Sequence, residues 1–214
     1  MRIVGHRMRL TQAHVERMRI PRRFWDVRFD QVPNDVRKDV GSYCRRLDEH
    51  LDRGDGLLLW GKNGVGKTSV AVLIALEVRR RGASVFFVTA EGLRHAVLNK
   101  ESFDDEWSII DRARSVDFLV LDDLGKEHPG ETGFTEKLFE NLVRERTASR
   151  RTTIVTTNIP LKLNDRDKDA RALVNWYVPS MVDVMKESLY PLQFVGGNIR
   201  DDVKKEMCSR MACG

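Results

Sequence analysis

Gly61-Lys62-Asn63-Gly64-Val65-Gly66-Lys67-Thr68 is the stretch that decides the fold, because it fits the spacing G-x-x-x-x-G-K-[ST] of a phosphate-binding loop. A short apolar run, residues 57–60, precedes it, and a largely apolar helical pattern over residues 68–81 follows it. Glycines let the backbone curl so that its N–H groups point at phosphate oxygens, and the helix N-terminus adds a favourable dipole. The sequence therefore predicts a strand–loop–helix unit that binds a nucleoside triphosphate, ATP.

Two residues of this loop have specific expected roles. Lys67 would reach the β and γ phosphates, and the Thr68 hydroxyl would ligate Mg²⁺. The residues expected to contact the nucleotide are Gly61, Asn63, Gly64, Val65, Gly66, Lys67, Thr68 and Ser69. ATP and Mg²⁺ are thus the predicted cofactors.

A pair of carboxylates ends a second apolar run, Phe118-Leu119-Val120-Leu121. In a parallel sheet the carboxyl end of such a strand lies beside the phosphate loop. We expect Asp122 to hold the Mg²⁺ shell together with Thr68, and Asp123 to orient and polarise the attacking water. The alternative is a pair of acids that simply ends a strand at a turn.

Thr156-Thr157-Asn158 ends a third apolar stretch, residues 152–156. The amide of Asn158 at this position would reach the γ-phosphate or the attacking water. Asparagine is also common at turns, so the residue type alone is a weak signal. Its place in the strand order favours a functional role.

Strand and helix patterns alternate along the chain, which predicts a parallel sheet covered by helices on both faces, an α/β fold. The predicted strands are residues 57–60, 84–89, 118–121, 152–156 and 192–195. The predicted helices are residues 34–53, 68–81, an interrupted pattern over 91–115, and 132–149.

The composition fits one ordinary domain: the chain has 214 residues, of which 41% are apolar and 32% are charged. No apolar run approaches the roughly 18–20 residues that a membrane helix needs, so we expect no membrane association. The three cysteines lack zinc-type spacing and are expected to be reduced thiols of a cytoplasmic protein.

The net charge of +5 is unevenly distributed. Residues 1–23 contain seven arginines and one acidic residue, Glu16. Such a segment binds nucleic acid or an acidic protein surface, or it is a solvated tail, and both readings stay open. We expect a basic arm at residues 1–20, an ATPase domain at residues 21–202 and a charged tail at residues 203–214.

Taken together, these motifs resemble the DnaC/IstB family of AAA+ ATPases over about residues 20–202. The resembling stretches are residues 21–24 with 29–30, Leu119 to Gly125, Ile154 to Leu161 and Gln193 to Arg200. The resemblance implies a P-loop three-layer αβα sandwich with a five-stranded parallel sheet in the order 5-1-4-3-2. It also implies a sensor arginine at Arg200.

As partners, the resemblance implies a replicative DnaB-type helicase, single-stranded DNA and further copies of the chain in an ATP-dependent ring or spiral. The DNA contacts are expected near the second and third helices, with Arg94, His95, Lys100 and Phe103 as candidates. An ordinary solvated helix and loop is the alternative for that region. Residues 10–20 are expected to form one basic helix that docks on the helicase through Val15 and Met18.

Members of the family usually have an arginine ahead of the last strand that reaches the ATP of the neighbouring subunit. This sequence has no arginine at the corresponding position. Counting back from Arg200 without gaps reaches Val184, and counting forward from Asn158 reaches Asn175. Arg171 is the nearest substitute, and residues 176–183 have the character of an insertion.

Three functions therefore stand as hypotheses. The leading one is an ATP-dependent helicase loader of the DnaC type, hydrolysing ATP to ADP and phosphate. The second is an IstB-like transposition helper that forms filaments on duplex DNA. The third is an ATP-gated interaction module with weak hydrolysis.

Overall fold

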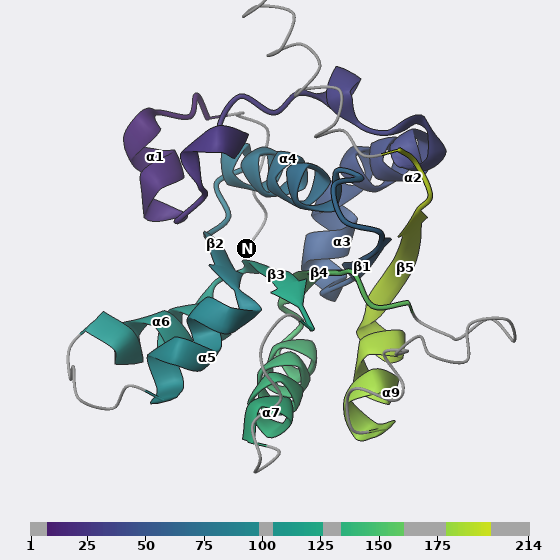
Figure 1. The fold of residues 1–214 in the computed structure, drawn as a ribbon. Coiled ribbons are helices and arrows are strands. Elements are labelled where there is room, and N and C mark those ends of the chain that lie inside the picture. The colour runs from purple at the N-terminus through teal and green to yellow at the C-terminus, as the bar shows by residue number, and fades with distance from the viewer. Residues whose placement is uncertain (1–7, 99–104, 126–133, 161–178, 198–214) are drawn as a thin grey trace, which may run out of the picture.

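Five parallel strands form the sheet at the centre of this computed structural model, which describes residues 8–98, 105–125, 134–160 and 179–197 (Figure 1). The strands are β1 Gly56–Gly61, β2 Val85–Thr89, β3 Phe118–Leu124, β4 Thr152–Thr157 and β5 Leu189–Phe194. Their order is β2-β3-β4-β1-β5, and every neighbouring pair is parallel. This is the predicted order 5-1-4-3-2 read from the other edge, so the predicted fold is confirmed.

Helices cover both faces of the sheet. They are α1 Gln12–Arg17, α2 Asn34–Arg45, α3 Leu47–Arg53, α4 Lys67–Arg80, α5 Ala90–Leu98, α6 Asp105–Ser115, α7 Phe134–Ala148 and α9 Pro179–Ser188, with single 3-10 turns at Arg22–Phe24 and Phe29–Gln31. Alternate strand residues point to opposite faces: Phe118 and Val120 pack with α1 to α4, whereas Leu119 and Leu121 pack with the α5, α7 and α9 side. The result is a three-layer αβα sandwich, with α4 above the sheet and α5 and α7 below it in Figure 1.

Three elements differ from the sequence expectation. The helix predicted over residues 34–53 is divided at Arg46, where φ is −105° and ψ is 24°. The last strand begins at Leu189 rather than at residue 192 and ends at Phe194. Helix α9 was not predicted, although it packs on the lower face through Val182 and Met185.

The N-terminal segment is part of the folded body from residue 8 onward. Its helix is shorter than predicted, Gln12–Arg17, with Thr11 as a side-chain cap. Val15, Met18 and Ile20 are buried in the same core as α4. The expectation that Val15 and Met18 are exposed docking anchors is therefore wrong, because the chain's own core already buries both side chains.

Both outer edges of the sheet have distinctive features. At the β2 edge, the backbone N–H of Phe87 donates to the carbonyl oxygen of Met18 at 2.8 Å, so the N-terminal segment continues the hydrogen bonding. At the β5 edge lies Pro191, a residue that strands accept mainly at edges because it has no N–H to donate. No helix in the described parts of the chain is long and apolar enough to cross a membrane.

Candidate nucleotide-binding site

The phosphate loop connects the end of β1 to the start of α4, as the sequence predicts. Gly61 has φ of +146°, and a Cβ there would collide with the carbonyl oxygen of Phe194 on the neighbouring β5. Gly66, which directly precedes α4, has φ of +96°, a region that side-chain-bearing residues rarely adopt. Both glycines are thus required by the backbone, and the loop ends in the N-terminus of a 14-residue helix.

Lys67 is almost completely buried, and oxygen atoms from the loop and from the residue that follows β4 bind its ammonium group. The Nζ atom donates to the carbonyl oxygens of Gly61 at 2.8 Å and Lys62 at 2.7 Å. It also donates to Oδ1 of Asn158 at 2.8 Å. Two residues separated by 91 positions in the sequence are therefore in direct contact, and both were predicted site residues.

Asp122 lies beside the loop, as expected for the carboxyl end of β3. Its Oδ1 atom accepts a hydrogen bond from the Thr68 hydroxyl at 2.9 Å. A hydroxyl and a carboxylate oxygen at this spacing are the hard donors that Mg²⁺ prefers, and this ion commonly takes one or two carboxylates and keeps several waters. Thr68 and Asp122 are thus suited to hold Mg²⁺. No group of three or more His, Cys, Asp or Glu residues in the described ranges is placed to hold a metal.

Asp123 has an unusual backbone conformation, with φ of +59°. The pairing of β3 with β4 shifts register between Leu121 and Leu124, so the two acids lie in a local irregularity of the ladder. This turns the Asp123 side chain away from the regular alternation of the strand. Such strained positions persist where surrounding contacts fix them, and they are frequent at functional sites.

Thr156 makes the contacts that fix Asp122 and Asp123. The sequence analysis did not identify this residue. Its fully buried hydroxyl donates to Asp122 Oδ1 at 2.6 Å and accepts the backbone N–H of Asp123 at 2.9 Å. A single side chain on β4 therefore holds both acids at the end of β3. The available signal was its position two residues before Asn158.

The end of β5 also lies at this edge of the sheet. Phe194 pairs with Gly61, and the N–H groups of Val195 and Gly196 donate to Asp35 Oδ2 at 2.7 and 3.3 Å. The segment that leads to Arg200 thus starts beside the phosphate loop. Arg200 itself lies outside the described residues, as do Arg171, Asn175, Lys100 and Phe103.

The remaining predicted residues have ordinary surroundings. Arg94 forms an ion pair with Glu91 on α5, with 3.2 Å between Nε and Oε2. Val184, one of the two positions where the family pattern would have an arginine, is buried in α9. Asn63 is exposed and Ser69 half-buried, both in or next to the loop.

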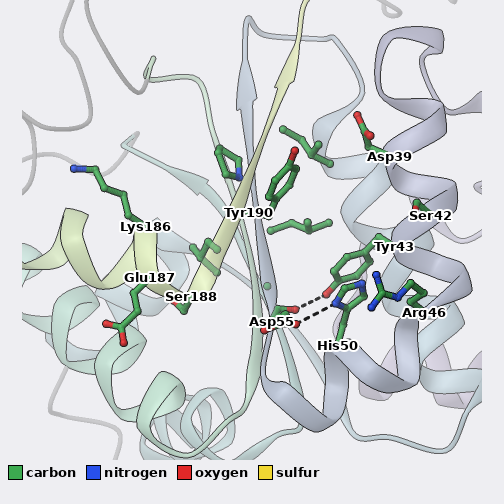
Figure 2. A pocket seen from close by; sticks show the side chains of 15 residues that line it. Asp39, Ser42, Tyr43, Arg46, His50, Asp55, Lys186, Glu187, Ser188 and Tyr190 are labelled. Carbon is green, nitrogen blue, oxygen red and sulfur yellow. Dashed lines mark hydrogen bonds and ion pairs between the residues drawn. The ribbon is translucent and has the colours of Figure 1, made fainter.

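A cavity of about 580 Å³ lies at the opposite end of the sheet (Figure 2). Figure 2 shows Tyr43, Arg46 and His50 on one side of β5, and Lys186, Glu187 and Ser188 on the other. Within it, the Tyr43 hydroxyl donates to the Asp55 carbonyl oxygen at 2.7 Å, and its ring stacks on His50. The cavity adjoins the first residues of β1 and β5, so it is separate from the phosphate loop at their other end.

The comparisons with known proteins agree with this geometry. The sequence profile of the family described as IstB-like ATP binding protein matches residues 3–171. The replicative helicase loader DnaC of Escherichia coli K12 is 30% identical over 120 residues, which are 55% of this chain and 48% of that protein. The chromosomal replication initiator DnaA of Helicobacter hepaticus is 24% identical over 130 residues, which are 61% of this chain and 28% of that protein.

The match thus spans less than half the length of both the DnaC and the DnaA relative. Among solved structures, the crystal structure of the DnaC helicase loader superposes with a TM-score of 0.65 at 23% identity, covering 81% of this chain and 99% of that one. This likeness supports the fold. Because the family's profile matches most of the sequence, the chain belongs to the family of IstB-like ATP-binding proteins, the DnaC/IstB branch of the P-loop AAA+ proteins.

Proposed function

We propose that the chain is an ATP-dependent helicase loader of the DnaC type, which assembles on a replicative DnaB-type helicase and helps to place it on single-stranded DNA. The observation that supports this most directly is the pair of contacts that joins the two halves of the site, Lys67 with Asn158 and Thr68 with Asp122. The likeness to DnaC gives the kind of partner.

Four side chains at the site support a role in ATP hydrolysis: Lys67, Thr68, Asp122 and Asp123. Lys67 would neutralise charge on the β and γ phosphates, and Thr68 and Asp122 would hold Mg²⁺, which would supply further positive charge at the phosphates. Asp123 orients a water for attack on the γ-phosphorus, which breaks the bond to the β,γ-bridging oxygen and releases ADP and phosphate. Asn158 and Arg200 would contact the γ-phosphate or the attacking water.

The contact between Lys67 and Asn158 suggests how the nucleotide state reaches the rest of the chain. A γ-phosphate competes with the Asn158 amide oxygen for the Lys67 ammonium group, because both are acceptors for the same donor. Binding of ATP would therefore release Asn158, and with it the segment that follows β4. A change at that segment on ATP binding is how the loader would assemble into a ring or spiral.

The arginine that completes the site is proposed to come from a second copy of the chain, with Arg171 as the candidate. Arg94, Lys100 and Phe103 remain proposed DNA contacts. The ion pair with Glu91 partly compensates the charge of Arg94, which weakens its case as a phosphate contact.

The direct test is capture of the cognate replicative helicase by the full chain with ATP, with ADP and without nucleotide. We expect a complex with ATP that is lost in Lys67→Met and retained in Lys62→Met, an exposed lysine of the same loop. Absence of a helicase complex under every nucleotide condition contradicts the proposal.

The second candidate is an IstB-like transposition helper, and the description of the matching family profile favours it. Filaments on duplex DNA, formed with ATP and without any helicase, would decide for this function. The third is an ATP-gated interaction module, which the buried Val184 at an expected arginine position favours. Turnover at background with helicase and single-stranded DNA both present would support it, and turnover that Arg171→Ala abolishes would exclude it.

A further inference from the structure

Two arginines from distant parts of the sequence converge on one aromatic ring at the β2 edge of the sheet. The guanidinium carbon of Arg112, on α6, lies 4.7 Å from the centroid of the Phe86 ring. That of Arg19, just after α1, lies 6.0 Å from the same centroid. The ring is fully buried, so the two guanidinium groups form the outer covering of this part of the sheet. We call Arg19 and Arg112 the β2-edge arginine pair.

Neither member of the pair forms an ion pair with a carboxylate among the residues that the structure describes. Arg112 donates to the backbone carbonyl oxygen of Arg17, a neutral acceptor. Burial, and after it the charge of Arg19, lowers the pKa of Arg112. Two cations that repel each other, with no ion-paired acid among the described side chains, make a site of positive potential, which an anion would stabilise.

The backbone fixes the position of Arg19, and the bond to the Arg17 carbonyl oxygen holds Arg112 beside it. Arg19 has φ of +58°, an uncommon conformation for a residue with a side chain. Hydrogen bonds hold it on both sides: its N–H donates to the Glu16 carbonyl oxygen at 2.9 Å, and the preceding Met18 carbonyl oxygen accepts from Phe87 on β2. A positive group whose position is already fixed loses little entropy when it binds an anion.

The chemistry of the surroundings indicates the ligand. The apolar side chains of this segment, Val15, Met18 and Ile20, point into the core. Its exposed charged residues include Arg17 and Arg19, with Glu16 as the one exposed acid of the described segment 8–20, so this face is not an apolar patch. Two further arginines of the segment lie over aromatic rings, Arg22 on Trp25 and Arg23 on Phe24. Guanidinium groups bind phosphate oxygens in a planar, bidentate manner, which suits a chain of phosphates better than an apolar partner helix.

We propose that the β2-edge arginine pair binds the phosphodiester backbone of single-stranded DNA. That the ligand is single-stranded DNA rests on the proposed function. The site itself lies apart from the nucleotide-binding site. β2 is at one edge of the sheet, and β3 and β4 separate it from β1 and its phosphate loop. The basic N-terminal segment is then a fixed DNA-binding surface of the ATPase body.

The test uses the full chain with ATP and a fluorescein-labelled oligodeoxythymidylate, with binding followed by anisotropy between about 50 and about 200 mM salt. The variant is Arg19→Gly with Arg112→Met. Glycine accepts the positive φ, and methionine keeps an apolar stem over Phe86. We expect the affinity to fall about tenfold, and the slope of log K against log salt to fall in magnitude by about 1.4, the value for two phosphate contacts on a single strand.

Two controls separate position from net charge. Arg45→Met with Arg53→Met removes two exposed arginines from α2 and α3 and should leave the slope unchanged. Arg19→Lys with Arg112→Lys keeps both charges and should keep most of the slope. Binding of a fluorescent ATP analogue and the thermal unfolding temperature check that each variant is folded.

An unchanged slope in Arg19→Gly with Arg112→Met overturns the inference, as does an equal loss in the Arg45 and Arg53 variant. Intact DNA binding with loss of the helicase complex would assign the pair to a protein partner instead, and it also overturns the inference. A normal helicase complex with an unchanged slope leaves the loader proposal standing, so the two failures are distinguishable.

Discussion

Two buried cations lie at opposite ends of the sheet, and their surroundings differ in one important respect. Lys67 is at the carboxyl end of the strands and is bound by two loop carbonyls and the amide of Asn158. Arg146, on α7, is at the amino end of β4 and is 1% exposed. Its guanidinium group donates to the Thr153 hydroxyl and to backbone carbonyls of Ala113, Arg114, Val116, Asp117 and Thr152.

The difference lies in whether other acceptors can replace the hydrogen-bond partners of each cation. Every donor nitrogen of Arg146 has a partner, and most of these acceptors belong to the ends of α6, β3 and β4, so the group joins structural elements. Lys67 has partners that sit on a glycine-rich loop and on one side-chain amide, and phosphate oxygens can take their place. Burial alone thus does not separate a structural cation from a functional one, whereas the kind of acceptor does.

The largest expected effect is on stability, from Arg146→Met. Removing the guanidinium group leaves several buried carbonyl oxygens without donors, and we expect a loss of about 4 kcal/mol in the free energy of unfolding. Urea unfolding measures it. Arg144→Met, an exposed position on the same helix, should change stability by less than about 0.5 kcal/mol. Equal effects of the two substitutions would contradict the structural role.

The next effect is on nucleotide binding, from Lys67→Met. We expect the affinity for ATP to fall about a hundredfold, because a charge-assisted contact to two phosphates is lost. Stability without nucleotide should change by less than about 1 kcal/mol, since glycine-rich loop carbonyls can turn to water. Titration of a fluorescent ATP analogue and urea unfolding give both numbers. Affinity that survives would show that Lys67 belongs to the same class as Arg146.

A smaller effect on turnover is expected from Thr156→Val. Without the hydroxyl, Asp122 loses one donor and the Asp123 N–H loses its acceptor, so kcat should fall about thirtyfold with little change in KM. Thr156→Ser should restore most of the rate. Thr152→Val is the matched control, because Thr152 is equally buried on the same strand and donates to the His50 carbonyl oxygen. A similar loss of kcat in the control would assign the effect to packing.

The smallest effect is expected at the amino end of β3, from Asp117→Ala. The Asp117 carboxylate accepts from the Ser84 N–H at 2.8 Å and the Ser84 hydroxyl at 2.7 Å, on an exposed surface. We expect a loss of about 1 kcal/mol in the free energy of unfolding and unchanged ATP affinity. Any change in ATP affinity would show that the two ends of the sheet are coupled.

The layers were predictable because strand and helix patterns alternate along the chain, whereas the sheet order was implied by the resemblance to the DnaC/IstB family. The close approach of Lys67, Thr68, Asp122 and Asn158 follows from that order alone. Thr156 was not predictable, since threonine is an ordinary strand residue and only its neighbour across the sheet reveals the hydrogen bond to Asp122. The roles of these residues in catalysis stay predictions.

The wrong expectations share a physical cause: each depends on a contact that a periodic pattern does not record. The pattern over residues 34–53 is continuous, but the break at Arg46 accompanies the stacking of His50 on Tyr43 at 4.3 Å. Val15 and Met18 have the spacing of an apolar helix face, and this spacing cannot tell a partner's surface from the chain's own core. The last strand was predicted from its apolar run at residues 192–195, whereas its first residues include Pro191, which an edge strand accepts.

The two edges of the sheet bear on how copies of this chain can meet. Open strand edges invite pairing with other strands, which leads to uncontrolled polymers. Here Met18 accepts from Phe87 at one edge, and Pro191 interrupts the row of donors at the other. Growth of the sheet from chain to chain is therefore disfavoured, which favours assembly through helix faces and loops, where nucleotide-dependent groups can control it.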